Sequence, residues 1–435
     1  MKMKKQTRMG VVVLIIMLLV SQAAIFASGA SEQEEDGKSI SMIHFMSPAY
    51  EAGDANDKAF AASMAEYREN HPDINVADEF VQHDNYQVKI KTMIASNTLP
   101  NVYYSKPDLF PLLRENNMIM PLTDMIETDP EFKALFKKGA FNDFTFDGDI
   151  WAIPFQLQSN HVVYYNKAMF KEVGFNEFPK TMSEFKDLVS KLRNAGYIPI
   201  SMGNKGRWLN PSCIFNTMVY RFTDASWFNS LYNDEGATFN DKPFVDAAKL
   251  MSELVSLGAF NEDMNSIDNN QQRVLFYNEE AAMFIEGSWA LGPVMDNMSE
   301  EQLKNVGLAI LPAIDGMPEY ANIVAGGPGW GIVINPDMSE ATKDVVIEFV
   351  KELYGQTFAN AAAANGGFPA VKPMIDEDAL HPLQVAYNNI DFEFAPIFDV
   401  QLPGSIVDVF YNDMQQLLIN EITPEEYAQN IENVR

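Results

Sequence analysis

The sequence of 435 residues is short of cysteine, of basic residues and of paired histidines, and each shortage excludes a class of protein. Cys213 is the only cysteine, which excludes intrachain disulfides and cysteine-based metal clusters. Lys and Arg number 31 against 60 Asp and Glu, a formal charge of -29, so nucleic acid is not an expected partner. The histidines never recur at the spacing of a metal-binding helix face, so no metal site is expected.

Sequence motifs of common enzymes are also missing. There is no P-loop, no G-x-S-x-G and no G-x-G-x-x-G, and the glycine cluster at 326–331 holds proline and tryptophan where a dinucleotide loop needs close backbone approach. Paired acids occur, but any chain with 60 acidic residues contains such pairs, so they do not indicate glycosidase chemistry. The sequence therefore predicts neither a catalytic site nor a cofactor.

The N-terminus is typical of a secretory signal peptide. Four basic residues precede an apolar run at 11–20, and small residues follow at 27–30. That run is only half of the roughly 20 residues that a membrane span needs, so we expect cleavage near Gly29 or Ala30 and an exported, soluble protein. No cysteine stands near this point, so no lipid anchor is expected. The polar residues 30–37 are predicted to be a disordered lead-in.

After the lead-in, strand-like and helical segments alternate. Apolar strands are predicted at 39–46, 74–80 and 101–104, with helical periodicity between them, which favours an α/β fold with mostly parallel sheets. The best-marked helix is predicted at 181–195, because Thr181 and Glu184 form a capping box at its start.

Several aromatic residues stand near turns or at the ends of strand-like runs. Trp208, Trp289 and Trp330 lie beside glycine or at such ends, and Tyr104 closes the run at 101–104. Sugar rings stack on aromatic faces, while their hydroxyls need amide or carboxylate partners. For any one of these aromatics a place in the core is the alternative reading; several at strand ends favour a ligand site. Polar residues that could bind hydroxyls follow the strand ending at Phe155: Gln156, Gln158, Ser159 and Asn160.

Four stretches resemble one family in order and spacing. DGDIWAIP at 147–154 and YYNKAMF at 164–170 are similar to the DGKxYAxP and YYNKxLF segments of family 1 extracellular solute-binding proteins, the maltose-binding type. PKTMSEF at 179–185 resembles PKTWDEF, with Met182 in place of tryptophan. The stretch from Phe276 to Trp289 resembles FxxGKAAMxxxGSW, with Glu279 and Glu280 in place of glycine and lysine.

This resemblance implies two α/β lobes that close on a ligand about crossing strands, as in type II periplasmic binding proteins. The protein would then deliver a mono- or oligosaccharide to the permease subunits of an inner-membrane ABC importer. Without a lipid anchor, a periplasm is the expected location, and a monomer is the expected state. The implied N-terminal lobe is 38–154 plus 312–353, the implied C-terminal lobe is 158–308 plus 358–435, and the crossings fall near 154–159, 309–312 and 353–357.

The family also implies ligand-binding positions. Trp289 matches the sugar-stacking aromatic, and the other expected site residues are Ser47, Tyr104, Ser105, Gln156, Gln158, Trp208 and Trp330. An exported carbohydrate-active enzyme and an adhesive surface protein remain alternatives. The ligand could also be a polyol, a peptide or a polyamine, since relatives of this architecture bind each of these.

Overall fold

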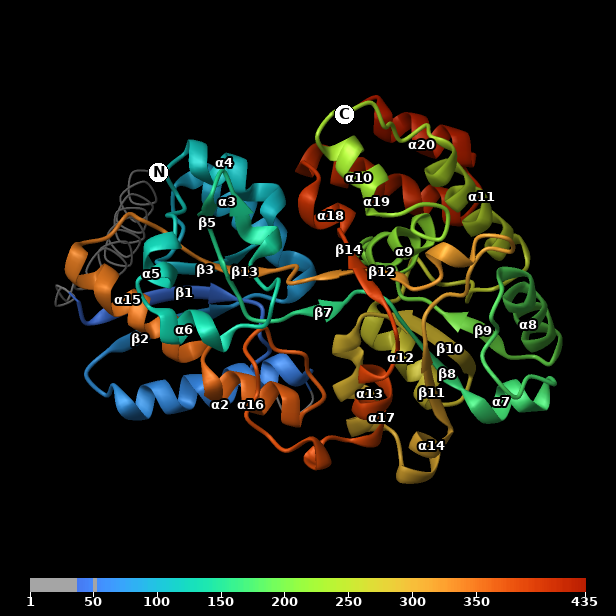
Figure 1. Cartoon of the computed structure of the whole chain (residues 1–435), viewed down its shortest axis with the longest axis horizontal. Coiled ribbons are helices and arrows are strands. Elements are labelled where there is room, and N and C mark those ends of the chain that lie inside the picture. The colour runs from blue at the N-terminus through green and yellow to red at the C-terminus, as the bar shows by residue number, and fades with distance from the viewer. Residues whose placement is uncertain (1–36, 50–52) are drawn as a thin grey trace, which may run out of the picture.

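The computed structural model describes residues 37–49 and 53–435, which form two lobes with short strands between them (Figure 1). Each lobe has its own sheet flanked by helices and its own hydrophobic core. This arrangement confirms the predicted two-lobed α/β fold. The predicted signal peptide at 1–29 and nearly all of the lead-in at 30–37 lie outside the described residues.

The N-terminal lobe is built on a five-stranded sheet in the order β2-β1-β3-β13-β6. Strand β1 (Ser39–His44) runs parallel to β2 (Asn75–Phe80) and β3 (Val102–Ser105), as the alternation of strands and helices predicts. Strand β13 (Gly331–Ile334) is antiparallel to both β3 and β6 (Ile153–Pro154). The sheet is therefore mixed rather than mostly parallel, because β13 enters it from the other lobe and runs back across it.

Helices cover both faces of this sheet and bury its apolar side chains (Figure 1). Helix α2 packs closely against α16, although about 300 residues separate them in the sequence. The helices of this lobe are α2 (Ala55–Asn70), α3 (His83–Ser96), α4 (Phe110–Glu115), α5 (Thr123–Glu127), α6 (Pro130–Leu135), α15 (Glu340–Leu353) and α16 (Gln356–Ala364).

The C-terminal lobe is built on a four-stranded sheet in the order β11-β8-β10-β9. Strand β10 (Ala281–Glu286) is fully buried, parallel to β9 (Ile198–Ser201) and antiparallel to β8 (Val162–Asn166). Strand β11 (Val306–Ala309) pairs antiparallel with β8 at the edge. This sheet is mixed as well, and Trp289, which follows the carboxyl end of β10, faces the space between the lobes.

The helices of the C-terminal lobe include the one that the sequence marks best. Helix α8 (Met182–Asn194) begins at the predicted capping box, where Thr181 and Glu184 bind each other's backbone, and this confirms the predicted helix. The other helices are α7 (Lys167–Glu172), α9 (Asn216–Val219), α10 (Ala225–Tyr232), α11 (Lys242–Ser256), α12 (Asn269–Tyr277), α13 (Leu291–Asn297), α14 (Glu300–Asn305), α17 (Pro382–Asn388), α18 (Phe398–Gln401), α19 (Gly404–Leu418) and α20 (Pro424–Glu432).

A small third sheet in the order β14-β12-β7 lies on the C-terminal side of the junction between the lobes (Figure 1). The first crossing runs from β6 to β7 (Gln158–Ser159). The second runs from β12 (Ile323–Gly327) to β13. The third follows Val371, which packs in the N-terminal core, and reaches α17 and β14 (Glu393–Ala395) in the C-terminal lobe.

These crossings differ from two that the sequence predicts. Residues 312–327 were expected in the N-terminal lobe, but Ile323 and Ala325 pack into the C-terminal core, and the chain crosses only after Gly327. The crossing expected at 353–357 is also displaced, because Phe358 and Ala362 of α16 still pack into the N-terminal core. Lobe membership depends on long-range packing, which a local apolar run does not reveal.

Candidate functional site: a cleft between the lobes

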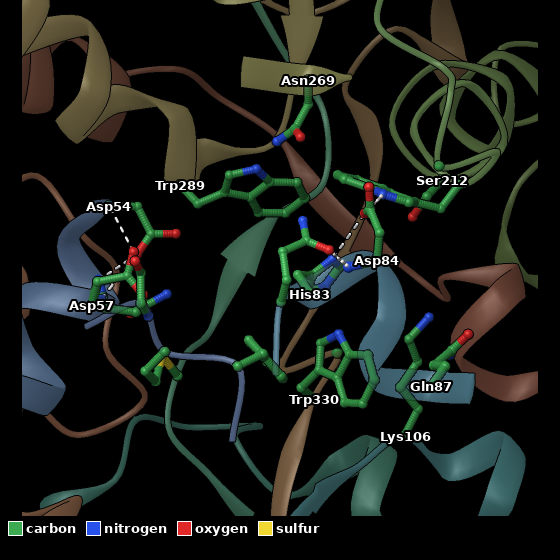
Figure 2. A pocket seen from close by; sticks show the side chains of 18 of the residues that line it. Asp54, Asp57, His83, Asp84, Gln87, Lys106, Ser212, Asn269, Trp289 and Trp330 are labelled. Carbon is green, nitrogen blue, oxygen red and sulfur yellow. Dashed lines mark hydrogen bonds and ion pairs between the residues drawn. The ribbon is translucent and has the colours of Figure 1, made fainter. Parts of the chain in front are cut away.

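A cleft of about 480 Å³ lies between the two lobes and is lined by both of them and by the crossing segments. The N-terminal lobe contributes the segment after β1 and the first turns of α2 and α3. The C-terminal lobe contributes the loop before α9, the start of α12 and the residues after β10. Figure 2 shows Trp289 and Trp330 with His83 between them, and Asp54 and Asp57 to one side.

Two tryptophans form an aromatic surface on the C-terminal side. Trp208 and Trp289 are partly exposed, and their ring centroids lie 6.1 Å apart. Trp208 Nε1 donates to Asp84 Oδ1 at 3.2 Å, across the cleft. Trp289 Nε1 donates to Glu286 Oε1 at 2.7 Å, within its own lobe. Because both indole N–H groups are bound to carboxylates, each ring can offer the cleft its apolar face.

The ring of Trp289 packs directly over Gly287. A β-carbon on Gly287 would collide with ring carbons of Trp289, so the glycine of the Gly-Ser-Trp stretch is required by this close approach. The neighbouring hydroxyl of Tyr164 donates to the Gly287 carbonyl at 3.0 Å and helps to hold the turn. The sequence therefore specifies how this tryptophan leaves the end of β10.

Glu286 holds Trp289 in place, and the sequence analysis did not single it out. Its carboxylate is fully buried and accepts hydrogen bonds from Arg273 Nε at 2.8 Å and Gln272 Nε2 at 2.9 Å, besides that from Trp289. Asn269 donates to it as well. A charged residue at the end of the apolar run AAMFIE was the available signal, since a buried carboxylate needs such partners.

Trp330 lies on the N-terminal side, at the base of the cleft. It is 9% exposed and packs against Phe45, with ring centroids 5.1 Å apart, and against Tyr86. Lys106 Nζ lies 5.3 Å from the centroid of its ring. Trp330 therefore lines the cleft and also belongs to the N-terminal core.

The side of the cleft at α2 is acidic. Asp54 is the N-cap of α2 and forms a capping box with Asp57. Burial and the adjacent Asp54 carboxylate raise the pKa of Asp57 to about 8, and burial also raises the pKa of Asp54. The predicted site residue Ser47 lines the cleft here, and its backbone N–H donates to Asp57 Oδ1 at 2.6 Å.

The predicted glutamines Gln156 and Gln158 line the cleft at the first crossing and are largely bonded to each other. Gln156 Nε2 donates to the carbonyl of Pro328 at 3.3 Å, which fixes the orientation of this amide. Its oxygen then accepts from Gln158 Nε2 at 2.8 Å and from Asn56 Nδ2 at 2.9 Å. This chain of amides ties α2 to two crossing segments.

Two predicted residues do not reach the cleft. Tyr104 is fully buried, with its hydroxyl bonded to that of Tyr354, and Ser105 is fully buried with Oγ donating to the Lys106 carbonyl. Neither lines the cavity. Helices cover both faces of the sheet at β3, so the side chains of this strand enter the core on either face. Lys106, one residue further on, reaches the cleft instead.

Other lining residues were not singled out from the sequence. They come from loops and helices that carry no local signature of a site, and they include Phe45, Asn56, His83, Asp84, Gln87, Lys106, Ser212, Asn269, Arg273, Asp399 and Tyr411. Over residues 37–49 and 53–435, no group of three or more His, Cys, Asp or Glu side chains could hold a metal ion. Within the same residues, no helix is long and apolar enough to cross a membrane.

Comparison with known families places this cleft in context. The sequence profile described as "Bacterial extracellular solute-binding protein" matches residues 52–359. The chain belongs to this family. The match confirms the resemblance that the four sequence stretches predict, and it favours a receptor over the alternative of an exported enzyme, because the family is defined by solute binding.

Individual relatives are distant. A probable sugar-binding periplasmic protein of Mesorhizobium japonicum is 22% identical over 63% of this chain and 64% of its own length. An sn-glycerol-3-phosphate-binding periplasmic protein of Brucella abortus is 27% identical over 42% of this chain and 41% of that protein. An uncharacterized ABC transporter extracellular-binding protein of Pyrococcus horikoshii is 22% identical over 54% of this chain and 53% of that protein. The chain thus spans about half the length of the known relatives that it matches.

Solved structures support the same fold over most of the chain. A chitin oligosaccharide binding protein superposes with a TM-score of 0.81 at 21% identity, covering 91% of this chain and 97% of that one. A maltose-bound protein of T. maritima superposes with a TM-score of 0.72 at 20% identity, covering 91% and 98%. At these identities the likeness establishes the architecture of two lobes around a cleft.

Proposed function

We propose that this solute-binding protein captures a carbohydrate between its lobes and delivers it to the permease of an ATP-driven importer. The observation that carries the proposal is the pair formed by Trp208 and Trp289. Their N–H groups are bound to Asp84 and Glu286, so their faces remain for stacking against the C–H face of a sugar ring. Amides and carboxylates around them can bind hydroxyls.

The charges in the cleft favour a neutral carbohydrate over a phosphorylated one. Arg273 is bound to the buried Glu286, and Lys106 Nζ lies 3.0 Å from Asp399 Oδ2. These two cations are thus neutralised within the protein, and the carboxylate of Asp84, whose pKa its hydrogen bonds to His83 and Trp208 keep low, adds negative charge nearby. Of the other lining cations, Lys91 lies 3.9 Å from Asp408, and Arg207 donates to the neutral amide of Asn412. The two neutralised cations and the nearby carboxylate disfavour a phosphate such as sn-glycerol 3-phosphate.

The proposed location is the periplasm, and the proposed state is a monomer. The N-terminal 29 residues have the composition of a signal peptide, and no cysteine is available there for lipid attachment. An unanchored binding protein would be lost from a cell with a single membrane, so an outer membrane is needed to retain it.

Isothermal titration calorimetry of the mature chain tests the proposal with four probes: maltose, N,N′-diacetylchitobiose, xylobiose and sn-glycerol 3-phosphate. We expect at least one saccharide to bind and to be recovered unchanged, with no heat from the phosphate. Mass spectrometry of the ligand retained through native purification gives a second identification. Binding of the phosphate alone would contradict the proposal, and hydrolysis of a bound saccharide would favour the enzyme alternative.

A further inference from the structure

Several polar contacts join the two lobes, among them Gln401 Nε2 with Asp143 Oδ1 at 3.4 Å and the following four. Trp208 donates to Asp84, Lys58 of α2 pairs with Asp296 of α13, Lys91 of α3 lies 3.9 Å from Asp408 of α19, and Lys106 pairs with Asp399 of α18. Of these four, only the pair of Lys106 and Asp399 is buried, with side chains 9% and 3% exposed. This pair therefore differs in kind from the other three.

The surroundings of the buried pair come from both lobes. Lys106 follows β3 of the N-terminal lobe and lies beside the ring of Trp330. On the C-terminal side, the Tyr411 hydroxyl donates to Asp399 Oδ2 at 2.6 Å, the same oxygen that Lys106 approaches. Asp399 Oδ1 is buried without a hydrogen-bond partner, and so is Oδ1 of Asp108, a second carboxyl group that interacts electrostatically with both Lys106 and Asp399. The rings of Trp330 and Tyr411 lie beside these two charges from opposite lobes. The charges are therefore shielded from water while the lobes are in contact, and not when the lobes separate.

Separation of the lobes would move these two charges apart and return each of them to water. In the closed form, removal of either partner would leave the other charge buried and uncompensated, which is strongly unfavourable. In the open form the remaining charge is solvated by water, so the same removal hardly changes the free energy of that form. A single substitution here therefore acts on closure and leaves the folding of each lobe largely untouched.

We propose that Lys106 and Asp399 form an electrostatic latch that makes closure of the lobes depend on both residues, and so determines how tightly the cleft retains its solute. The step from closure to solute retention rests on the proposed function. The latch itself concerns only the equilibrium between open and closed lobes. It is tested without any ligand, so its failure and that of the carbohydrate assignment are distinguishable.

The test measures closure by cross-linking in the absence of ligand. Lys58→Cys and Asp296→Cys place two thiols at a contact between the lobes, and a short bis-maleimide joins them only when the lobes are shut. Cys213 does not interfere, because it is buried and burial raises the pKa of its thiol. The cross-linking rate is compared between this background and the same background with Lys106→Met.

We expect Lys106→Met to lower the cross-linking rate by about 100-fold or more, in keeping with the loss of one partner of a buried pair. Lys91→Met is the matched control, because its exposed pair joins the same lobes; we expect a change of less than about fivefold. If the background is mostly closed, Lys106→Met should shift the equilibrium toward the open form. Small-angle scattering would then give a larger radius of gyration for Lys106→Met than for the background. Equal rates and equal radii for Lys106→Met and the background would overturn the latch.

Two further variants separate the latch from simple loss of structure. Asp399→Asn removes the hydrogen-bonded carboxylate of Lys106 and leaves only the buried Asp108 near its charge. It should therefore lower the rate in the same direction as Lys106→Met, with each variant melting near the wild-type temperature. Lys106→Met combined with Asp399→Leu removes both charges, so the rate should return to within about tenfold of the background. A double variant as slow as Lys106→Met would overturn the assignment to the ion pair.

Discussion

The two partly exposed tryptophans of the cleft are fixed in different ways. Trp289 is bound to Glu286, which belongs to the same lobe and is itself held by Arg273. Trp208 is bound to Asp84, which belongs to the opposite lobe. Trp289 is therefore oriented before the lobes meet, whereas the observed orientation of Trp208 depends on their contact. The ring of Trp289 is thus preorganised within its lobe, whereas the hydrogen bond of Trp208 requires the lobes to be in contact.

The largest expected effect comes from removal of Trp289, the ring that is held within its own lobe. We expect Trp289→Ala to weaken saccharide binding by about tenfold to a hundredfold, since a stacked, dried ring is worth roughly 1–3 kcal/mol. Calorimetry with the saccharide found in the four-probe titration measures the loss. Trp289→Phe, which keeps a ring over Gly287, is the control and should lose less. The unliganded melting temperature should stay near that of the wild type. A collapse of that temperature with unchanged affinity would assign Trp289 to the core.

The second ring is tested by removing only its hydrogen bond. Trp208→Phe keeps an aromatic face but loses the donor to Asp84, so we expect affinity to fall by about fivefold, the equivalent of about 1 kcal/mol. Because this bond crosses between the lobes, the melting temperature without ligand should hardly change. If Trp208→Phe and Trp289→Phe lose the same saccharide affinity, the hydrogen bond between the lobes and the one within a lobe do not differ in their effect on binding.

The acidic side of the cleft gives the smallest expected effect, and it depends on pH. The pKa of Asp57 is about 8 in the folded chain and near 3.8 in the unfolded chain, so the folded form keeps a proton that the unfolded form releases. The stability that this group contributes is therefore lost as pH rises from about 4 to about 8. We expect Asp57→Asn to narrow the difference in melting temperature between pH 5 and pH 9 by about 2 °C. An unchanged difference would contradict the buried, protonated state of Asp57.

Local features of the fold were predictable, and the assignment of segments to lobes was not. The capping box at Thr181 and the strand at 39–46 are specified by neighbouring residues, and the structure has α8 and β1 there. The apolar run of β12 is compatible with the core of either lobe. Its packing with segments distant in the sequence determines that it belongs to the C-terminal lobe. Glu279 shows a further local constraint: it follows the end of α12 with φ of 59°, a left-handed conformation that explains the family's glycine at this position.

For the candidate site, single residues next to turns were predictable and partners from distant segments were not. Trp208, Trp289, Trp330, Gln156, Gln158 and Ser47 line the cleft. Tyr104 and Ser105 do not, because the sheet is covered by helices on both faces and β3 therefore buries all its side chains. Asp399 lies nearly 300 residues from Lys106, so no sequence window joins them.

The position of β13 has a consequence for the order in which the chain is made. Strand β13 lies between β3 and β6 in the N-terminal sheet, so β6 has no strand to pair with until Ile334 has been synthesised. Contacts between residues so far apart form slowly, because a long loop must close before they contribute. A chain that is threaded through a membrane must remain unfolded until it has passed. The late arrival of β13 keeps the nascent N-terminal lobe incomplete for most of translation, which suits the export that the first 29 residues predict.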